Sequence, residues 1–204
     1  MTAMINNYSV EAVREAYKPI VTVFGSSSCG PETRLYRLSE EIGSLLARYG
    51  FTSATGGYTG TMDAVAKGAK KEQGKSIGIT TKEVSKINPN VSAYLTEEFC
   101  EETLMSRLDL LINIGDIFLF LPGSTGTLTE LSLVWDKQKL GITPIKPCIL
   151  FSDTWRKIFR IMFVDGDPLV PTSTFKKEKA VQESTYLVNS IKELDDLLHN
   201  GIGQ

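Results

Sequence analysis

The stretch Asp116-Ile117-Phe118-Leu119-Phe120-Leu121-Pro122-Gly123-Ser124-Thr125-Gly126-Thr127-Leu128-Thr129-Glu130 joins a short apolar run to a segment with helical character. The apolar run is typical of a strand that is buried on both faces of a parallel sheet. Gly123 and Gly126 allow a tight turn that lets the backbone approach a ligand closely. Thr125 and Thr127 offer hydroxyl donors or a helix cap. Because free N–H groups and the positive end of the helix dipole meet at such a turn, it predicts an anion site that suits phosphate.

The carboxylate that follows this turn is an unusual addition. Glu130 lies in the predicted first turn of the helix, where the dipole favours its ionised form. A phosphate site gains nothing from a second negative charge, so the side chain is expected to meet sugar hydroxyls, a water or a developing cation. The alternative is a structural role as a helix-terminal charge, worth about 0.3 to 1 kcal/mol.

Length and composition indicate one globular domain over residues 1–204, with an N-terminal extension at 1–18 and a C-terminal strand and helix at 165–204. The chain is 42% hydrophobic and 23% charged, and its net charge of −2 argues against binding of long nucleic acid. Small anionic ligands remain possible because they need only a local field.

The distribution of cysteine and apolar residues favours the cytoplasm. Cys29, Cys100 and Cys148 are odd in number and far apart, so neither a disulfide framework nor a metal site is predicted. There is no apolar run long enough to cross a membrane, and the first 19 residues lack the apolar core of a secretory signal. We therefore expect a soluble protein without a membrane partner.

Strand-like and helix-like segments alternate along the chain, which predicts an α/β fold: a doubly wound, Rossmann-like domain with a mainly parallel sheet flanked by helices. Residues 81–95 are expected to be irregular. The predicted strands are 19–24, 51–55, 76–80, 116–121, 146–151 and 186–188. The predicted helices are 9–16, 32–49, 62–73, 96–114, 128–140, 153–164 and 190–198.

Three strand-to-helix turns are rich in small residues, and in a parallel sheet all three lie at the carboxyl edge of the strands, where one ligand can meet several of them. The first turn lacks the Gly-x-Gly-x-x-Gly pattern, so a standard NAD site is not predicted. The serines either bind the ligand or satisfy the backbone of their own turn. The predicted substrate- and phosphate-binding residues are Gly25, Ser26 and Ser27; Gly56, Gly57, Thr59, Gly60 and Thr61; and Pro122, Gly123, Ser124, Thr125, Gly126 and Thr127.

Residues 24–28, 56–69 and 122–130 resemble, in order and spacing, the three signature blocks of the LONELY GUY family, whose members were long labelled possible lysine decarboxylases. The resemblance implies a phosphoribohydrolase that cleaves the N-glycosidic bond of cytokinin nucleotides or AMP and works as a homodimer. It also implies a Rossmann fold and no cofactor. A decarboxylase would need a Schiff-base lysine for pyridoxal phosphate, and no such lysine is identified.

The family signature pairs Pro-Gly-Gly-x-Gly-Thr-x-x-Glu with an upstream Met-x-x-Arg-Lys. Here Ser124 replaces the second glycine and Leu108 replaces the lysine, whereas Arg107 and Glu130 are kept. The resemblance implies that Glu130 and Arg107 are catalytic, with the carboxylate stabilising an oxocarbenium-like sugar and the guanidinium clamping phosphate. The alternative for Arg107 is an exposed helix residue paired with a nearby acid.

Two functions therefore remain open. The first is a nucleotide N-glycosidase that releases base and ribose 5-phosphate from a purine or cytokinin nucleoside 5′-monophosphate. The second, suggested by Ser124 and Leu108, is a non-catalytic carrier of a nucleotide or of the molybdenum cofactor. His199, the sole histidine, lies near the C-terminus, so catalysis by a Ser-His-Asp triad is not expected.

Overall fold

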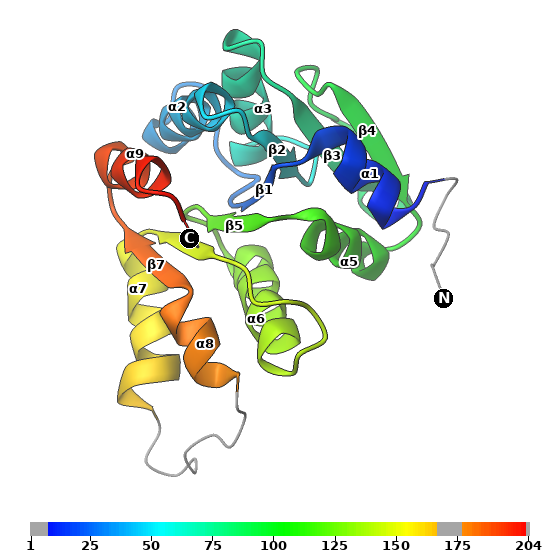
Figure 1. Ribbon diagram of the computed structural model, residues 1–204. Helices are drawn as coiled ribbons and strands as arrows, with labels where there is room; N and C mark the ends of the chain where they lie inside the picture. The colour runs from blue at the N-terminus through cyan, green and yellow to red at the C-terminus, as the bar shows by residue number, and fades with distance from the viewer. Residues whose placement is uncertain (1–7, 167–176, 203–204) are drawn as a thin grey trace.

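The computed structural model describes residues 8–166 and 177–202. Its strands form one seven-stranded sheet in the order β4-β3-β2-β1-β5-β6-β7, and every pair of neighbours is parallel (Figure 1). The strands are β1 (Ile20–Phe24), β2 (Thr52–Thr55), β3 (Ser76–Thr81), β4 (Glu97–Glu101), β5 (Ile117–Phe120), β6 (Cys148–Phe151) and β7 (Thr185–Val188). The predicted doubly wound α/β fold is confirmed.

Helices cover both faces of this sheet. The helices of one face are α1 (Val10–Tyr17), α5 (Leu104–Ile114), α6 (Thr125–Lys139), α7 (Asp153–Arg160) and α8 (Glu178–Glu183), and those of the other are α2 (Arg34–Arg48), α3 (Thr61–Lys71) and α9 (Ile191–His199). A short α4 (Lys82–Ser85) follows β3, and a π-helical turn η1 (Ile161–Asp165) extends α7.

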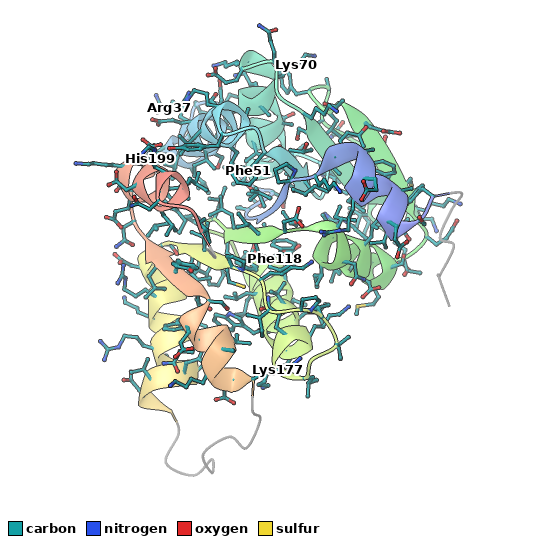
Figure 2. All side chains as sticks on the ribbon, viewed as in Figure 1. Arg37, Phe51, Lys70, Phe118, Lys177 and His199 are labelled. Atoms are coloured by element: carbon teal, nitrogen blue, oxygen red, sulfur yellow. The ribbon has the colours of Figure 1, made fainter. Side chains whose placement is uncertain are left out.

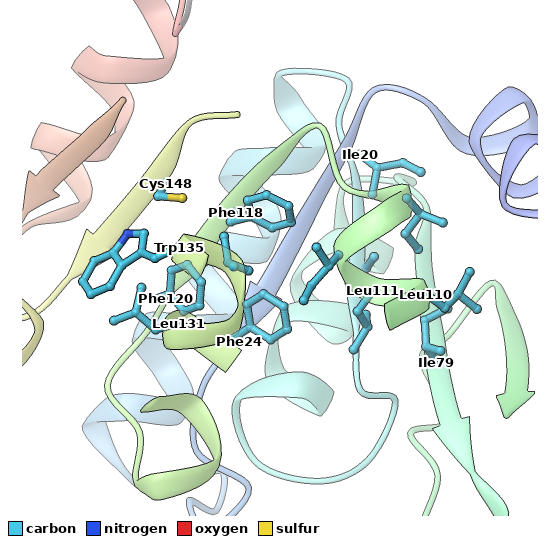
Figure 3. Packing of buried hydrophobic residues seen from close by; sticks show 14 of the residues in the cluster. Ile20, Phe24, Ile79, Leu110, Leu111, Phe118, Phe120, Leu131, Trp135 and Cys148 are labelled. Atoms are coloured by element: carbon cyan, nitrogen blue, oxygen red, sulfur yellow. The ribbon is translucent and has the colours of Figure 1, made fainter. Parts of the chain in front are cut away.

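Two apolar clusters, one on each face of the sheet, hold these layers together. On the face of α5 and α6, Phe24 stacks on Phe120 at 5.0 Å between ring centroids, and Leu131 packs beside them (Figure 3). The residues of β1, β2, β3, β5 and β6 are buried throughout, as expected for inner strands of a parallel sheet.

The strand order places a switch point between β1 and β5. From β1 the chain winds outward through β2, β3 and β4, and it then returns to the other side of β1 as β5. In open α/β sheets the connections leave such a point in opposite directions, and ligands bind outside the carboxyl ends of the two strands. We call this edge, at the ends of β1 and β5, the crevice. The first and third glycine-rich turns follow β1 and β5 and therefore meet at this crevice.

The predicted helix over 96–114 is wrong in its first half, because residues Glu97–Glu101 form strand β4 and the helix begins only at Leu104. Glu97 and Glu98 are exposed on this edge strand, where charged side chains remain in water. The glutamates favoured a helix locally, but pairing with β3 outweighs that preference.

Smaller differences occur elsewhere. Within the stretch expected to be irregular, residues Lys82–Ser85 form α4, and α8 was not predicted. Part of the predicted C-terminal region, residues 167–176, and the first seven residues of the N-terminal extension lie outside the described residues. Over the described ranges, no helix combines the length and apolar character needed to cross a bilayer.

Candidate functional site

The three glycine-rich turns converge as predicted, and hydrogen bonds from the first turn hold them together. The Ser26 amide donates to the carbonyl of Pro122 in the third turn (3.2 Å), and the Ser26 carbonyl accepts from the Thr61 amide of the second turn (2.9 Å). The Thr59 hydroxyl donates to the Ser27 carbonyl (3.1 Å). The crevice edge is therefore one hydrogen-bonded unit built from turns that are far apart in sequence.

Glycine is required where these turns pass one another. Gly60 has a φ of +75°, and a Cβ there would lie 2.3 Å from the Ser26 carbonyl oxygen. Gly25 lies against the Thr61 side chain, and Gly123 lies against the Thr127 side chain. The small residues thus serve first to pack the turns together.

Several polar side chains of the turns are used within the protein. The Ser26 hydroxyl accepts from the Ser28 amide at 3.1 Å, which satisfies the turn itself, whereas Ser27 is exposed. Thr59 and Thr61 do not cap α3, because its N-cap residue is Gly60 and makes no side-chain hydrogen bond. Gly57, with a φ of +78°, completes the second turn.

The third turn presents the N-terminus of α6 to the crevice. Ser124 is the N-cap residue, and its side chain makes no hydrogen bond to the helix. Its φ of −113° is ordinary for an L-residue, so serine replaces the family glycine here without strain. Thr125 and Gly126 are exposed and Thr127 is buried. The first amides of α6 are not capped by the Ser124 side chain, which suits an anion.

Arg107 reaches from α5 beneath the second turn. It is 8% exposed, its Nε donates to the Ile79 carbonyl at 2.8 Å, and its guanidinium lies 5.7 Å from the centre of the Tyr58 ring. A Cβ on Gly56 would lie only 1.6 Å from Arg107 Nη2, so the missing side chain of Gly56 leaves the space for the guanidinium.

The alternative reading of Arg107, as an exposed residue paired with a neighbouring acid, is wrong. The acids near it in sequence have other partners: Glu101 accepts from Tyr8, Glu102 pairs with Lys82, and Asp109 pairs with Lys137. Leu108, which follows Arg107, is 4% exposed and belongs to the interior rather than to the crevice.

The prediction that Glu130 lies in the first turn of its helix is wrong, because α6 begins at Thr125 and has no acidic residue in its first turn. Its ionised form is therefore not favoured by the helix dipole. Glu130 and Arg107 instead perturb each other electrostatically. Burial raises the pKa of Glu130 to about 7, while the positive charge of Arg107 acts in the opposite direction. Burial lowers the pKa of Arg107, and Glu130 opposes that change. Since the two side chains form no ion pair within 4 Å in the described part of the chain, the carboxylate is influenced by the guanidinium without being neutralised by it. A carboxyl group whose pKa lies near neutrality can act as a base or as a stabilising charge.

Two further placements concern residues outside the predicted set. His199 is exposed on α9 at the periphery of the molecule, as expected (Figure 2). Sequence reasoning missed Tyr58, whose ring contacts the Arg107 guanidinium and whose hydroxyl bonds to the Thr81 backbone. The available signal was a large aromatic residue within a glycine-rich turn.

Fold and strand order together define a Rossmann-like α/β protein whose first and third glycine-rich turns meet at the switch point of its sheet. A sequence profile of the SLOG cluster4 family matches residues 18–159, and the chain belongs to this family. This result confirms the resemblance to LONELY GUY proteins.

Individual relatives carry phosphoribohydrolase names. A cytokinin riboside 5′-monophosphate phosphoribohydrolase of Rhodococcoides fascians is 31% identical over 134 residues, which is 65% of this chain and 67% of the relative. A protein of the same name from Mycobacterium tuberculosis is 31% identical over 123 residues, which is 59% of this chain and 64% of the relative.

Solved structures show the same fold at lower identity. The molybdenum cofactor binding protein from Rippkaea orientalis has a TM-score of 0.66 at 23% identity. The match covers 90% of this chain and 96% of the Rippkaea chain. The molybdenum cofactor carrier protein of Chlamydomonas reinhardtii has a TM-score of 0.66 at 17% identity. The match covers 90% of this chain and 97% of the carrier protein. These likenesses bear on the fold alone.

Proposed function

We propose that this protein is a phosphoribohydrolase that releases the base and ribose 5-phosphate from a purine or cytokinin nucleoside 5′-monophosphate. One observation carries the proposal: Glu130 of α6, with a pKa of about 7, interacts electrostatically with the buried guanidinium of Arg107. The names of the relatives support the same reaction class. An AMP-like nucleotide is the proposed small-molecule partner, and the cytoplasm is the proposed location.

The residues divide the work between anchoring and chemistry. The amides at the start of α6, with Ser124 to Thr127, hold the 5′-phosphate. Gly25, Ser26 and Gly123 let the ribose lie close to the backbone between β1 and β5. Arg107 supplies a fixed positive charge, because a guanidinium stays protonated at physiological pH. It is fixed beside the second turn and orients the nucleotide there by attracting negative charge.

Glu130 carries the chemical step. As the bond between C1′ and the base nitrogen breaks, its electrons leave with the base and positive charge develops on the sugar. The ionised carboxylate stabilises that charge and accepts a proton from the water that adds to C1′. That proton passes to the departing base, directly or through solvent water, which restores the carboxylate and leaves the neutral base and ribose 5-phosphate as products.

A second candidate is a nucleotide or cofactor carrier that uses this crevice without turnover. It is favoured by Leu108, because the buried leucine supplies no cation where the enzyme signature has lysine. The carrier hypothesis predicts stoichiometric ligand binding and no product.

The decisive assay incubates the full chain with AMP and with N6-prenylated AMP and follows free base by chromatography. We expect base release by wild type and a loss of about a hundredfold or more in Glu130→Gln, in line with removal of one charge-stabilising group. Native mass spectrometry of the same samples tests the carrier. Stoichiometric binding with no base release, equal for wild type and Glu130→Gln, would reject the enzyme in favour of the carrier.

A further inference from the structure

A cavity of about 490 Å³ lies at the same edge of the sheet, on the side of α2 and α3. Its walls come from the first two turns, from the helices α2 and α3, and from the segment 90–94 that precedes β4. The side chains that matter for its chemistry are Tyr36, Asp63, Ser92 and Tyr94. Its volume is in the range of small-molecule sites, and neither Glu130 nor Arg107 lines it.

Asp63 is held in a fixed orientation at the wall of this cavity. The Tyr36 hydroxyl donates to its Oδ2, and the Ser92 hydroxyl donates to its Oδ1 at 2.7 Å. Ser92 is in turn fixed, because its amide donates to the Gly57 carbonyl at 2.9 Å. A carboxylate has about four acceptor positions, so one donor on each oxygen leaves each oxygen able to accept again. Two parallel donors from a ligand match this arrangement.

The two tyrosine rings at the cavity favour a neutral ligand over a cationic one. Lys67 Nζ lies 5.6 Å from the centre of the Tyr36 ring, and Lys70 Nζ lies 5.7 Å from the centre of the Tyr94 ring. Each ring therefore already has a cation over one face, and a cationic ligand would be repelled. A neutral planar ring can stack on such tyrosines and be held at its edge by the carboxylate.

We propose that this cavity binds the 2-amino-4-oxopyrimidine edge of a guanine or a pterin. In that edge a ring N–H and an exocyclic amine point the same way, so they can donate to the two oxygens of Asp63 at once. Thr59 and Gly60 of the second turn line this cavity and are also predicted substrate-binding residues. The occupant of the cavity nevertheless needs neither a phosphate nor Glu130, so failure of this proposal can be told from failure of the proposed hydrolysis.

The test is isothermal titration of the full chain with guanosine, inosine and neopterin. Guanosine and inosine differ only by the 2-amino group, and neither carries a phosphate that could engage α6. We expect guanosine or neopterin to bind at least about tenfold more tightly than inosine, the size of effect that loss of a hydrogen bond to a charged group produces. Whichever of guanosine and neopterin binds more tightly shows whether the cavity prefers a guanine or a pterin.

Matched variants assign the preference to the carboxylate. Asp63→Asn should abolish the discrimination against inosine, whereas Asp195→Asn should keep it, because Asp195 likewise accepts from a tyrosine hydroxyl, that of Tyr49, but lies outside the cavity. Tyr36→Phe keeps the ring and removes only the donor to Asp63, so it should weaken guanosine binding even if Asp63→Asn does not fold. Equal affinities for guanosine and inosine, no binding of guanosine or neopterin, or unchanged discrimination in folded Asp63→Asn would each overturn the proposal.

Discussion

At the scale of single residues, the unusual property of Glu130 is that burial has raised the pKa of its carboxyl group to about 7. If the ionised form of Glu130 does the chemistry, kcat/KM for AMP should rise about tenfold per pH unit below 7 and level off above it. Glu130→Gln should show a low and flat profile over the same range. Activity that falls as the pH rises through 7 would instead assign Glu130 the role of a proton donor.

The same shift makes a separate prediction about stability. A carboxyl group whose pKa is raised on folding stabilises the fold fully only below its unfolded pKa, and this contribution is lost as the pH rises through 7. Between pH 5 and pH 8 the free energy of unfolding of the wild type should therefore fall by on the order of 2 kcal/mol relative to that of Glu130→Gln. This figure allows for the partial exposure of the side chain. Urea unfolding at both pH values measures the difference. A constant gap between the two proteins would contradict it.

Gly56 tests how Arg107 is held. Because a Cβ at this position would meet Arg107 Nη2 at 1.6 Å, Gly56→Ala should displace the guanidinium and cost about 1 to 3 kcal/mol of unfolding free energy. Gly126→Ala is the matched control for stability, since a Cβ there has nothing within 4 Å. We expect only Gly56→Ala to lower the melting temperature, and equal melting temperatures would show that the site for Arg107 is not as tight as described.

At the scale of elements, much of the fold follows from the sequence. The alternation of apolar runs and amphipathic segments predicted six of the seven strands, because buried parallel strands and covering helices have distinct local patterns. Strand β4 was missed because its glutamates read as helical, and only its pairing with β3 defines it. The converging turns were predictable from topology. The roles of Tyr58 and Asp63 were not, since they depend on side chains brought together from distant segments.

Helix α7 supports the third turn through one buried hydrogen bond. Trp155 Nε1 donates to the Leu121 carbonyl at 2.8 Å, directly before Pro122. Trp155→Phe should leave that carbonyl unsatisfied, cost about 1 to 3 kcal/mol of stability and raise the KM for AMP. Trp135→Phe is the control, because the Trp135 indole nitrogen is equally buried but has no hydrogen-bond partner within the described residues. Equal KM values for the two variants would show that the hydrogen bond from α7 does not support substrate binding by the third turn.

At the scale of the whole molecule, we propose a homodimer. Ile161 and Met162 of η1 are 59% and 61% exposed, and they line an apolar groove of about 400 Å³ with Leu128 of α6. Covering this groove with a second copy would remove apolar surface from water. The double variant Ile161→Asp/Met162→Asp should be monomeric by light scattering, whereas Ile87→Asp, at an isolated position that is 88% exposed, should remain dimeric. A monomeric wild type would contradict the proposal.

The central claim is that the crevice between β1 and β5 holds a nucleoside monophosphate with its reactive carbon beside Glu130. A crystal structure of Glu130→Gln soaked with AMP tests it most directly, because the variant should bind substrate without consuming it. We predict the phosphate at the first amides of α6 and C1′ of the ribose next to the substituted side chain. AMP bound elsewhere, or bound with C1′ turned away from that side chain, would contradict the account.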